Sequence, residues 1–102
     1  MTYDGNVTFE WDPEKDLRNR RKHGIGFADA VRIFESEAEC LDLWDDSHPG
    51  GEERFITIGP LEDRLVLVVW TERDVDTVRV ISARWATRGE CDLYRRRMEE
   101  ET

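Results

Sequence analysis

The sequence predicts a single α+β domain: a short N-terminal strand and two helices packed on a curved antiparallel sheet of four strands, followed by a C-terminal helix. Three observations lead to this fold class. Helix start and stop signals occur near both ends of the chain, segments rich in Val, Ile and Leu are separated by turn residues in its middle, and 102 residues with 38% hydrophobic content suffice for one small core. We therefore expect one domain over residues 1–102.

The N-terminal part is predicted to form a short strand and then a helix. Val7–Trp11 is typical of a strand. Asp12 is a favourable N-cap and Pro13 suits the first helical position, so a helix is expected to start here and to include Glu14–His23. Gly24 is typical of the residue that ends a helix.

Two further helices are predicted from apolar spacing and capping. After Gly26, apolar residues at i, i+3, i+4 and i+7 predict a second helix with a buried stripe, formed by Phe27, Ala30, Val31 and Phe34. Thr87 and Glu90 form a capping box that predicts the start of the last helix. The residues expected on its inner face are Cys91, Tyr94 and Met98.

The middle of the chain is predicted to form the sheet. The segments rich in β-branched and aliphatic residues are Cys40–Trp44, Arg54–Gly59, Arg64–Thr71 and Thr77–Ala83. Their connections are short enough for a meander. The segment Asp45–Gly51 contains Asp, Ser, Pro and Gly and is therefore expected to be a loop.

The composition excludes several classes of protein. The longest apolar run, Leu65–Trp70, is far shorter than the roughly 20 residues that cross a bilayer, and the N-terminus lacks the features of a secretory signal. We therefore expect a soluble cytoplasmic protein that does not associate with a membrane. Cys40 and Cys91 lack the spacing of a metal site, which predicts free thiols and no metal or cofactor.

The positive charges of this acidic chain are concentrated in two stretches. The chain has 24 acidic and 15 basic residues and a formal net charge of -9. The first basic stretch is Arg18, Arg20, Arg21, Lys22 and His23, and the second is Arg79, Arg84, Arg88 and Arg95–Arg97. If folding brings the two stretches together, they form a surface suited to a phosphate backbone.

Four motifs in register resemble the BrnT toxins. They are Phe9–Lys15, Arg21–Phe27, Glu52–Gly59 and Arg79–Arg84, and the resemblance extends from Phe9 to Tyr94. The resemblance implies a RelE-like fold and a ribonuclease toxin of a type II toxin–antitoxin pair that inhibits translation. It also implies a small BrnA-like antitoxin as partner, RNA as substrate, and contact with operator DNA only through the antitoxin.

Metal-independent cleavage of RNA requires a base for the ribose 2′-hydroxyl, cations for the phosphate and a proton donor for the leaving oxygen. Guanidinium groups match the non-bridging phosphate oxygens, and the candidates for this clamp are Arg54, Arg79 and Arg84. Lys22, His23 and Glu53 are the candidates for proton transfer, and the sequence does not choose among them. Further contacts to RNA are expected from Arg18, Arg21, Ser82, Trp85 and Arg88.

Each assignment has a structural alternative. Lys22 and His23 precede a helix-ending glycine, where cations favour the negative end of the helix dipole. Arg54 and Arg79 are alternatively members of charged cross-strand pairs, and Trp85 is alternatively a core residue.

The acidity of the chain weakens its general attraction for RNA and leaves a second functional interpretation. In that interpretation the protein is a catalytically inactive, toxin-like module that only binds the antitoxin. The segment Glu35–Glu53 contains acidic residues but no Lys or Arg, and it is our candidate surface for a basic segment of the antitoxin, against the alternative of a merely solvated surface.

Overall fold

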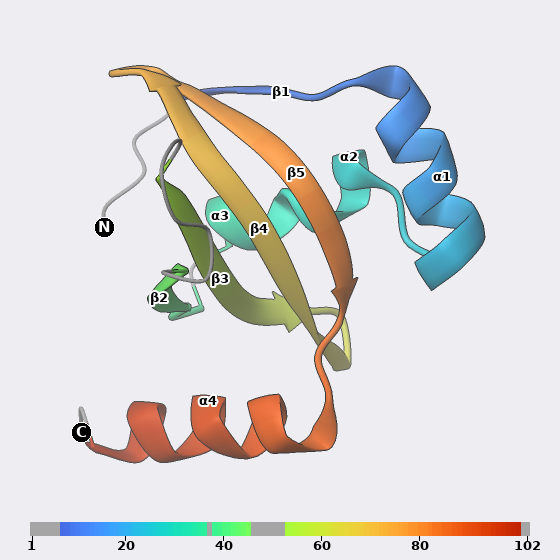
Figure 1. Ribbon diagram of the computed structural model, residues 1–102. Coiled ribbons are helices and arrows are strands. Elements are labelled where there is room, and N and C mark those ends of the chain that lie inside the picture. The colour runs from blue at the N-terminus through green and yellow to red at the C-terminus, as the bar shows by residue number, and fades with distance from the viewer. Residues whose placement is uncertain (1–6, 37, 46–52, 101–102) are drawn as a thin grey trace.

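The computed structural model describes residues 7–36, 38–45 and 53–100 and contains one twisted sheet with helices on both faces (Figure 1). In chain order the elements are β1 (Thr8–Glu10), α1 (Pro13–His23), α2 (Phe27–Ala30), α3 (Arg32–Glu35), β2 (Leu41–Asp45), β3 (Arg54–Leu61), β4 (Arg64–Asp74), β5 (Thr77–Trp85) and α4 (Arg88–Glu100). In Figure 1, α2 and α3 lie behind β4 and β5, α1 lies beside β5, and α4 crosses the lower end of the sheet.

The sheet has five strands in the order β1-β5-β4-β3-β2, so the prediction of a four-stranded antiparallel sheet is wrong. The meander from β2 to β5 is antiparallel as predicted, but β1 adds a fifth strand that pairs in parallel with β5. Its register matches Thr8 with Thr77 and Glu10 with Arg79. A strand of three residues contains too little periodicity to reveal a partner so distant in sequence.

Helix α1 begins and ends where its capping residues predict. The Asp12 carboxylate accepts a hydrogen bond from the Glu14 backbone N–H at 2.9 Å, and Pro13 is the first helical residue. Gly24 has a φ of 74°, in the left-handed region that glycine adopts without strain, and its N–H donates to Arg20 O.

The second predicted helix is in fact two short helices. The chain turns at Val31, which separates α2 from α3. The predicted apolar stripe is nevertheless buried, and its members Phe27, Ala30, Val31 and Phe34 all belong to the core. The apolar spacing therefore identified the inner face correctly but did not detect the break, because two successive short helices preserve nearly the same spacing.

Three strands extend further than their apolar runs. β3 continues to Leu61, β4 to Asp74 and β5 to Trp85, because paired neighbours supply backbone hydrogen bonds even where the side chains are charged. The predicted loop at Asp45–Gly51 lies mostly outside the described residues, except that Asp45 is the last residue of β2.

The two faces of the sheet cover two different cores, because successive side chains of a strand point to opposite sides. One face, the α1–α3 face, packs Val66, Val68 and Trp70 of β4 against residues of α2 and α3 and against Ile25, which follows α1. The other, the α4 face, buries Leu41, Ile58 and Leu67, against which the α4 residues Leu93, Tyr94 and Met98 are packed. Helix α4 therefore covers only one end of its face.

Both cysteines are free thiols and half-buried, as predicted. Burial, and secondly the charge of Asp42, raises the pKa of the Cys40 thiol to about 11. Cys40 also lies so close to Gly59 that a Cβ added there would be 2.6 Å from its sulfur. No helix among the described residues is long and apolar enough to cross a membrane.

Candidate active site on the α4 face

A β-bulge places Arg79 and Arg84 on the same face of β5. An odd number of positions separates them, so a regular strand would point them to opposite faces. In the structure Arg79 pairs with Thr71 and Arg84 with Leu67, which are an even number of positions apart on β4. The register shifts between these pairs, where Ile81 has no opposing residue. The bulge therefore brings both arginines to the α4 face.

Arg54 lies in the same lateral row of the α4 face as Arg79. Phe55 pairs with Trp70, so Arg54 continues the register opposite Thr71, whose hydroxyl donates to Glu53 O at 2.6 Å. Thr71 in turn pairs with Arg79. Two strand spacings separate Arg54 from Arg79, or about 10 Å between their Cα atoms, and long guanidinium side chains can converge across this distance.

Carboxylates stand at both ends of this row. Asp45 pairs with Arg54 across β2 and β3, and Glu10 pairs with Arg79 across β1 and β5. The Arg79 Nη1 is 3.5 Å from Glu10 Oε1, which is shared with Arg73 Nε at 3.2 Å. This buried oxygen makes no hydrogen bond of good geometry to a described residue. The Arg79 side chain is 32% exposed, and such long ion pairs contribute little to stability.

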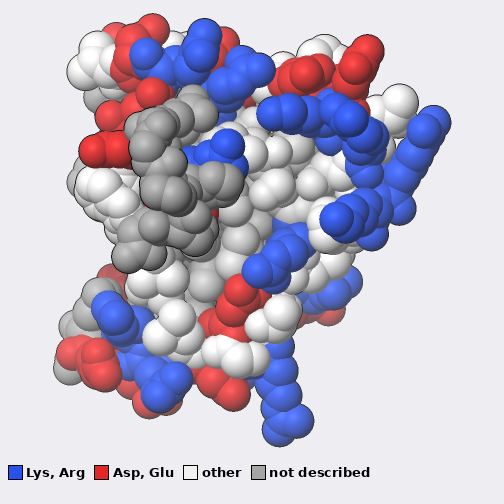
Figure 2. All heavy atoms as spheres, in the orientation of Figure 1, with Lys and Arg blue, Asp and Glu red and all other residues white. Residues whose placement is uncertain are grey.

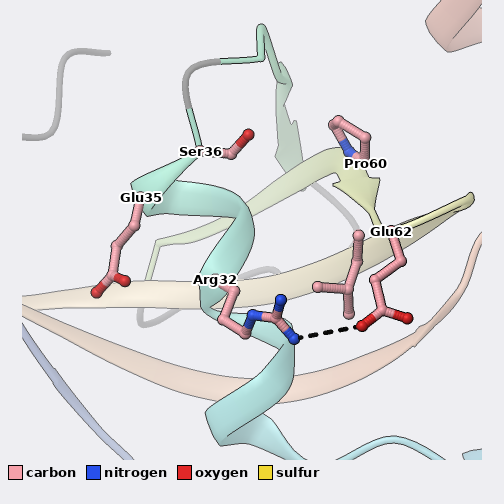
Figure 3. A pocket seen from close by; sticks show the side chains of 6 residues that line it. Arg32, Glu35, Ser36, Pro60 and Glu62 are labelled. Carbon is pink, nitrogen blue, oxygen red and sulfur yellow. Dashed lines mark ion pairs between the residues drawn. The ribbon is translucent and has the colours of Figure 1, made fainter.

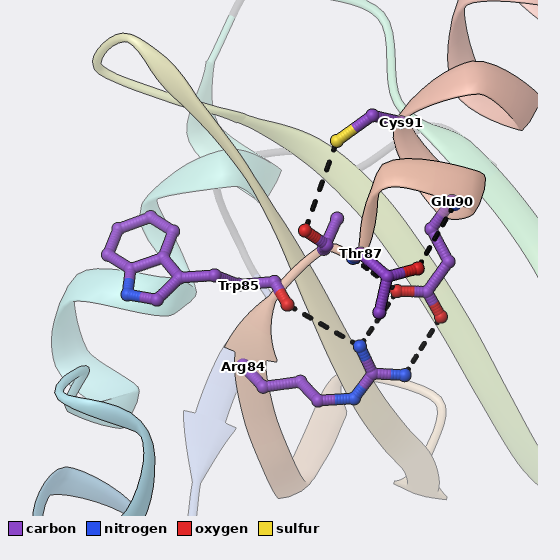
Figure 4. A network of polar contacts seen from close by, with 6 residues as sticks. Arg84, Trp85, Thr87, Glu90 and Cys91 are labelled. Atoms are coloured by element: carbon purple, nitrogen blue, oxygen red, sulfur yellow. Dashed lines mark hydrogen bonds and ion pairs between the residues drawn. The ribbon is translucent and has the colours of Figure 1, made fainter.

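Arg84 is held far more tightly, by a network at the start of α4 (Figure 4). Its Nη1 and Nη2 donate to the two carboxylate oxygens of Glu90 at 2.7 and 2.8 Å, and Nη1 also donates to Trp85 O at 3.4 Å. Glu90 Oε1 additionally accepts from the Thr87 N–H, and the Glu90 N–H donates to the Thr87 hydroxyl. The predicted capping box is thus confirmed, but its carboxylate serves a second partner.

The ion pair shifts both titrations in the direction that favours the charged forms. The hydrogen bond from Arg84 is the main cause that lowers the pKa of Glu90 to about 2. The same bond raises the pKa of Arg84. Sequence reasoning missed this pair, because no periodic signal links a strand residue to a helix residue across a turn.

Ser82 joins the arginines on the α4 face, whereas Trp85 does not. Ser82 is half-buried opposite Val69, in the row between those of Arg79 and Arg84. Trp85 points the other way, as Figure 4 shows, and packs against the α1–α3 core with the Arg64 guanidinium 3.9 Å from its ring centroid. Trp85 and Arg84 are therefore sequence neighbours on opposite faces.

Asn19, a residue that the sequence analysis did not select, fixes α1 to the edge of β5. Strand β1 pairs only as far as Arg79, which leaves the next part of that edge without a strand partner. The Asn19 amide donates to Ala83 O at 2.7 Å and to Ile25 O at 2.9 Å, and its oxygen accepts from the Ala83 N–H at 3.2 Å. A buried asparagine thus replaces a strand and sets α1 beside β5.

The basic residues of α1 lie near the β5 edge of the sheet and do not join the arginine networks. Arg18, Arg21 and Lys22 are exposed and His23 is half-buried. Figure 2 shows basic side chains over α1 at the right of the molecule, beside a largely uncharged surface. No hydrogen bond or ion pair of the described residues links Lys22 or His23 to Arg79 or Arg84.

The other two candidates are exposed. Glu53 immediately precedes β3, next to Arg54, and Arg88 is the first residue of α4.

Two pockets of the described residues lie away from this face. One of about 280 Å³ lies beside α3 and the β3–β4 turn and contains the Arg32–Glu62 ion pair at 3.7 Å (Figure 3). Its lining residues are Arg32, Glu35, Ser36, Pro60, Leu61 and Glu62. A neighbouring pocket of about 200 Å³ includes Trp85. Of the candidate site residues, Trp85 alone lines either of these pockets.

Comparison with known proteins gives two matches of consequence. The family model for the ribonuclease toxin BrnT of type II toxin–antitoxin systems matches residues 11–90, which include every candidate site residue. The crystal structure of the Brucella abortus ribonuclease toxin BrnT is similar with a TM-score of 0.60 and 27% sequence identity, covering 80% of this chain and 99% of that chain. Among curated proteins, none matches the sequence significantly.

Proposed function

This chain belongs to the BrnT family of ribonuclease toxins of type II toxin–antitoxin systems, and we propose that it cleaves RNA without a metal ion and thereby inhibits translation. We further propose that its catalysis is of the RelE-like kind and that a BrnA-like antitoxin neutralises it. One observation supports the proposal most strongly: Arg54, Arg79, Ser82 and Arg84 share one face of the sheet.

This arrangement suits the transition state of RNA cleavage. Negative charge accumulates on the non-bridging oxygens as the 2′-oxygen forms its bond to phosphorus, and on the 5′-oxygen as its bond to phosphorus breaks. Arg54 and Arg79 flank Thr71 in one row of the face, and Ser82 adds a hydroxyl in the adjacent row. The guanidinium groups stabilise this charge electrostatically and need no metal ion.

The proton transfers are assigned to residues at the margin of this face. Glu53 flanks Arg54, and Lys22 and His23 end the helix that Asn19 fixes beside β5 (Figure 1). One of them removes the 2′-hydroxyl proton, and another protonates the 5′-oxygen as it leaves. Substitution of each in turn, with kcat measured against pH, separates the base from the acid.

The antitoxin is assigned to the acidic segment around β2. Of its described acids, Glu35, Glu39, Asp42 and Glu53 are exposed, and β2 is an edge strand of the sheet. Trp44 in the same strand is 60% exposed and supplies an apolar contact. A basic segment of the antitoxin fits this surface by charge, whereas RNA is repelled by it.

A catalytically inactive module that only binds the antitoxin is the second candidate function. It is favoured by the tight pairing of Arg84 with Glu90, which neutralises one cation of the clamp. It predicts the same antitoxin binding and no cleavage.

Cleavage of labelled single-stranded RNA by the purified protein in a chelating buffer decides between the two functions. We expect cleavage that the antitoxin abolishes and that R79A reduces strongly. R97A is the matched control, because it removes the same charge from an exposed position of α4. Cleavage that depends on an added metal ion contradicts the mechanism. No cleavage at any metal concentration, with antitoxin binding intact, supports the inactive module.

A further inference from the structure

Glu90 connects the candidate site to the helix that flanks it. Its side chain is 25% exposed and lies between β5 and the first turn of α4. Among the described residues, Oε2 accepts from Arg84 alone, whereas Oε1 accepts from both Arg84 and the Thr87 N–H. The hydrogen bond from the Thr87 N–H therefore fixes the orientation of the Glu90 carboxylate, and the carboxylate in turn fixes the Arg84 guanidinium.

The hydrogen bonds to Arg84 leave a defined part of its guanidinium for another anion. Of the five N–H groups of an arginine, two donate to Glu90 and one to Trp85 O. The remaining two are Nε–H and one Nη2–H, which point in the same direction and form the side-on fork of the group. Neither has a partner among the described residues, and the side chain is 37% exposed.

The capping box of Thr87 and Glu90 begins helix α4, which is packed on the sheet. Leu93, Tyr94 and Met98 of α4 pack on the second core, and the Tyr94 hydroxyl donates to Glu39 O at 2.7 Å. The low pKa of Glu90 keeps its carboxylate ionised throughout the neutral range. Arg84 is thus held in one orientation by a charged group at the start of a packed helix, as preorganised electrostatic catalysis requires.

We propose that Glu90 is a positioning residue for RNA cleavage, which holds the Arg84 guanidinium so that its Nε–H and Nη2–H fork binds a phosphate of the RNA. The inference rests on the proposed ribonuclease function and adds to it a residue outside the candidate site. The Glu90 carboxylate lowers the affinity of the neighbouring site for phosphate. Its advantage for catalysis is that it orients the Arg84 guanidinium.

The test compares E90Q with T87A in steady-state cleavage of labelled RNA. E90Q keeps an acceptor for the Thr87 N–H but loses the charged, two-point hold on Arg84. We expect kcat to fall by about tenfold to about 100-fold, while KM is unchanged or lower because one negative charge is gone. T87A removes the hydroxyl that accepts from the Glu90 N–H and keeps the Arg84–Glu90 pair, so we expect kcat within about twofold of wild type. Thermal unfolding of both variants monitors the fold.

A double-mutant cycle with R84A separates positioning from a structural role. If Glu90 acts through Arg84, E90Q lowers kcat by less than about twofold in the R84A background. An equal loss in both backgrounds, an unchanged kcat in E90Q, or a higher kcat in E90Q each overturns the inference. Absence of cleavage by the wild-type protein is a different result, because it contradicts the proposed function itself.

Discussion

At one end of the α4 face, Arg79 forms an ion pair of 3.5 Å with Glu10, which also contacts Arg73. At the other end, Arg84 donates two hydrogen bonds of 2.7 and 2.8 Å to Glu90. Both arginines come from β5 and reach the same face because of the bulge at Ile81. The first pair is long and shared, so we expect a phosphate to displace it readily. The second is part of the fold, since it joins β5 to the cap of α4. Arg79 is therefore expected to serve function, and Arg84 both function and stability.

R84A is expected to have the largest effect, because it removes a proposed phosphate ligand and leaves Glu90 without its cation. We predict a loss of about 100-fold to about 1,000-fold in kcat/KM. The free energy of unfolding should fall by about 2 kcal/mol, the usual contribution of a charge-assisted hydrogen-bonded pair that is partly exposed. Cleavage kinetics and urea unfolding measure the two effects, and an unchanged stability contradicts the structural role.

R79A is expected to reduce cleavage by about 100-fold while changing the free energy of unfolding by less than about 1 kcal/mol. The reason is that its ion pair with Glu10 is long and shared. The same two measurements apply, with R97A as the control for loss of one positive charge. If R79A destabilises the protein as much as R84A, the proposed difference between a functional Arg79 and a structural Arg84 is wrong.

N19A tests whether Asn19 anchors α1 to the edge of β5 between Arg79 and Arg84. Its amide makes hydrogen bonds with Ile25 and Ala83, and alanine leaves the backbone groups of Ala83 unsatisfied. We expect a loss of about 2 kcal/mol in urea unfolding. In conditions where the variant is fully folded, we expect cleavage within about tenfold of wild type, because neither arginine contacts Asn19 in the described structure. If N19A has the same midpoint of urea unfolding as the wild type, Asn19 does not anchor α1 to β5.

The pH dependence of stability gives the smallest and most specific effect. The pKa of Glu90 is lowered from its ordinary value of 4.5 to about 2, so its contribution is complete above about pH 4.5 and is lost as the pH falls toward 2. The difference in unfolding free energy between wild type and E90Q should therefore be about 1–2 kcal/mol at neutral pH and shrink below pH 4.5. A difference that is constant down to pH 2 contradicts the ion pair.

What the sequence predicts correctly here is local. Asp12, Gly24 and the Thr87–Glu90 box act through atoms a few residues away, and all of them mark helix ends in the structure. The break at Val31 was missed because apolar spacing reports the buried side of a segment and not its hydrogen bonding. The strands β3, β4 and β5 were predicted, but their C-terminal extensions were not, because backbone pairing continues beyond the apolar residues that mark a strand in the sequence.

The geometry of the site depends on contacts that sequence patterns do not contain. The inserted residue at Ile81 decides whether Arg79 and Arg84 share a face, and no composition signal marks a bulge within a run of β-branched residues. The parallel partner of β1 and the edge contact of Asn19 both join residues far apart in the chain. Candidate site residues could therefore be selected from the sequence, but their arrangement could not.

Whether the arginines of β5 bind RNA together is tested most directly by their own NMR signals. The ¹⁵N-labelled protein is titrated with a 2′-O-methyl RNA oligonucleotide, which lacks the attacking hydroxyl and is not cleaved. We predict that the Nε–H signals of Arg79 and Arg84 shift together along one binding curve, while that of Arg97 stays in place. Shifts confined to Arg18 and Arg21 of α1, with Arg79 and Arg84 unmoved, would contradict the account.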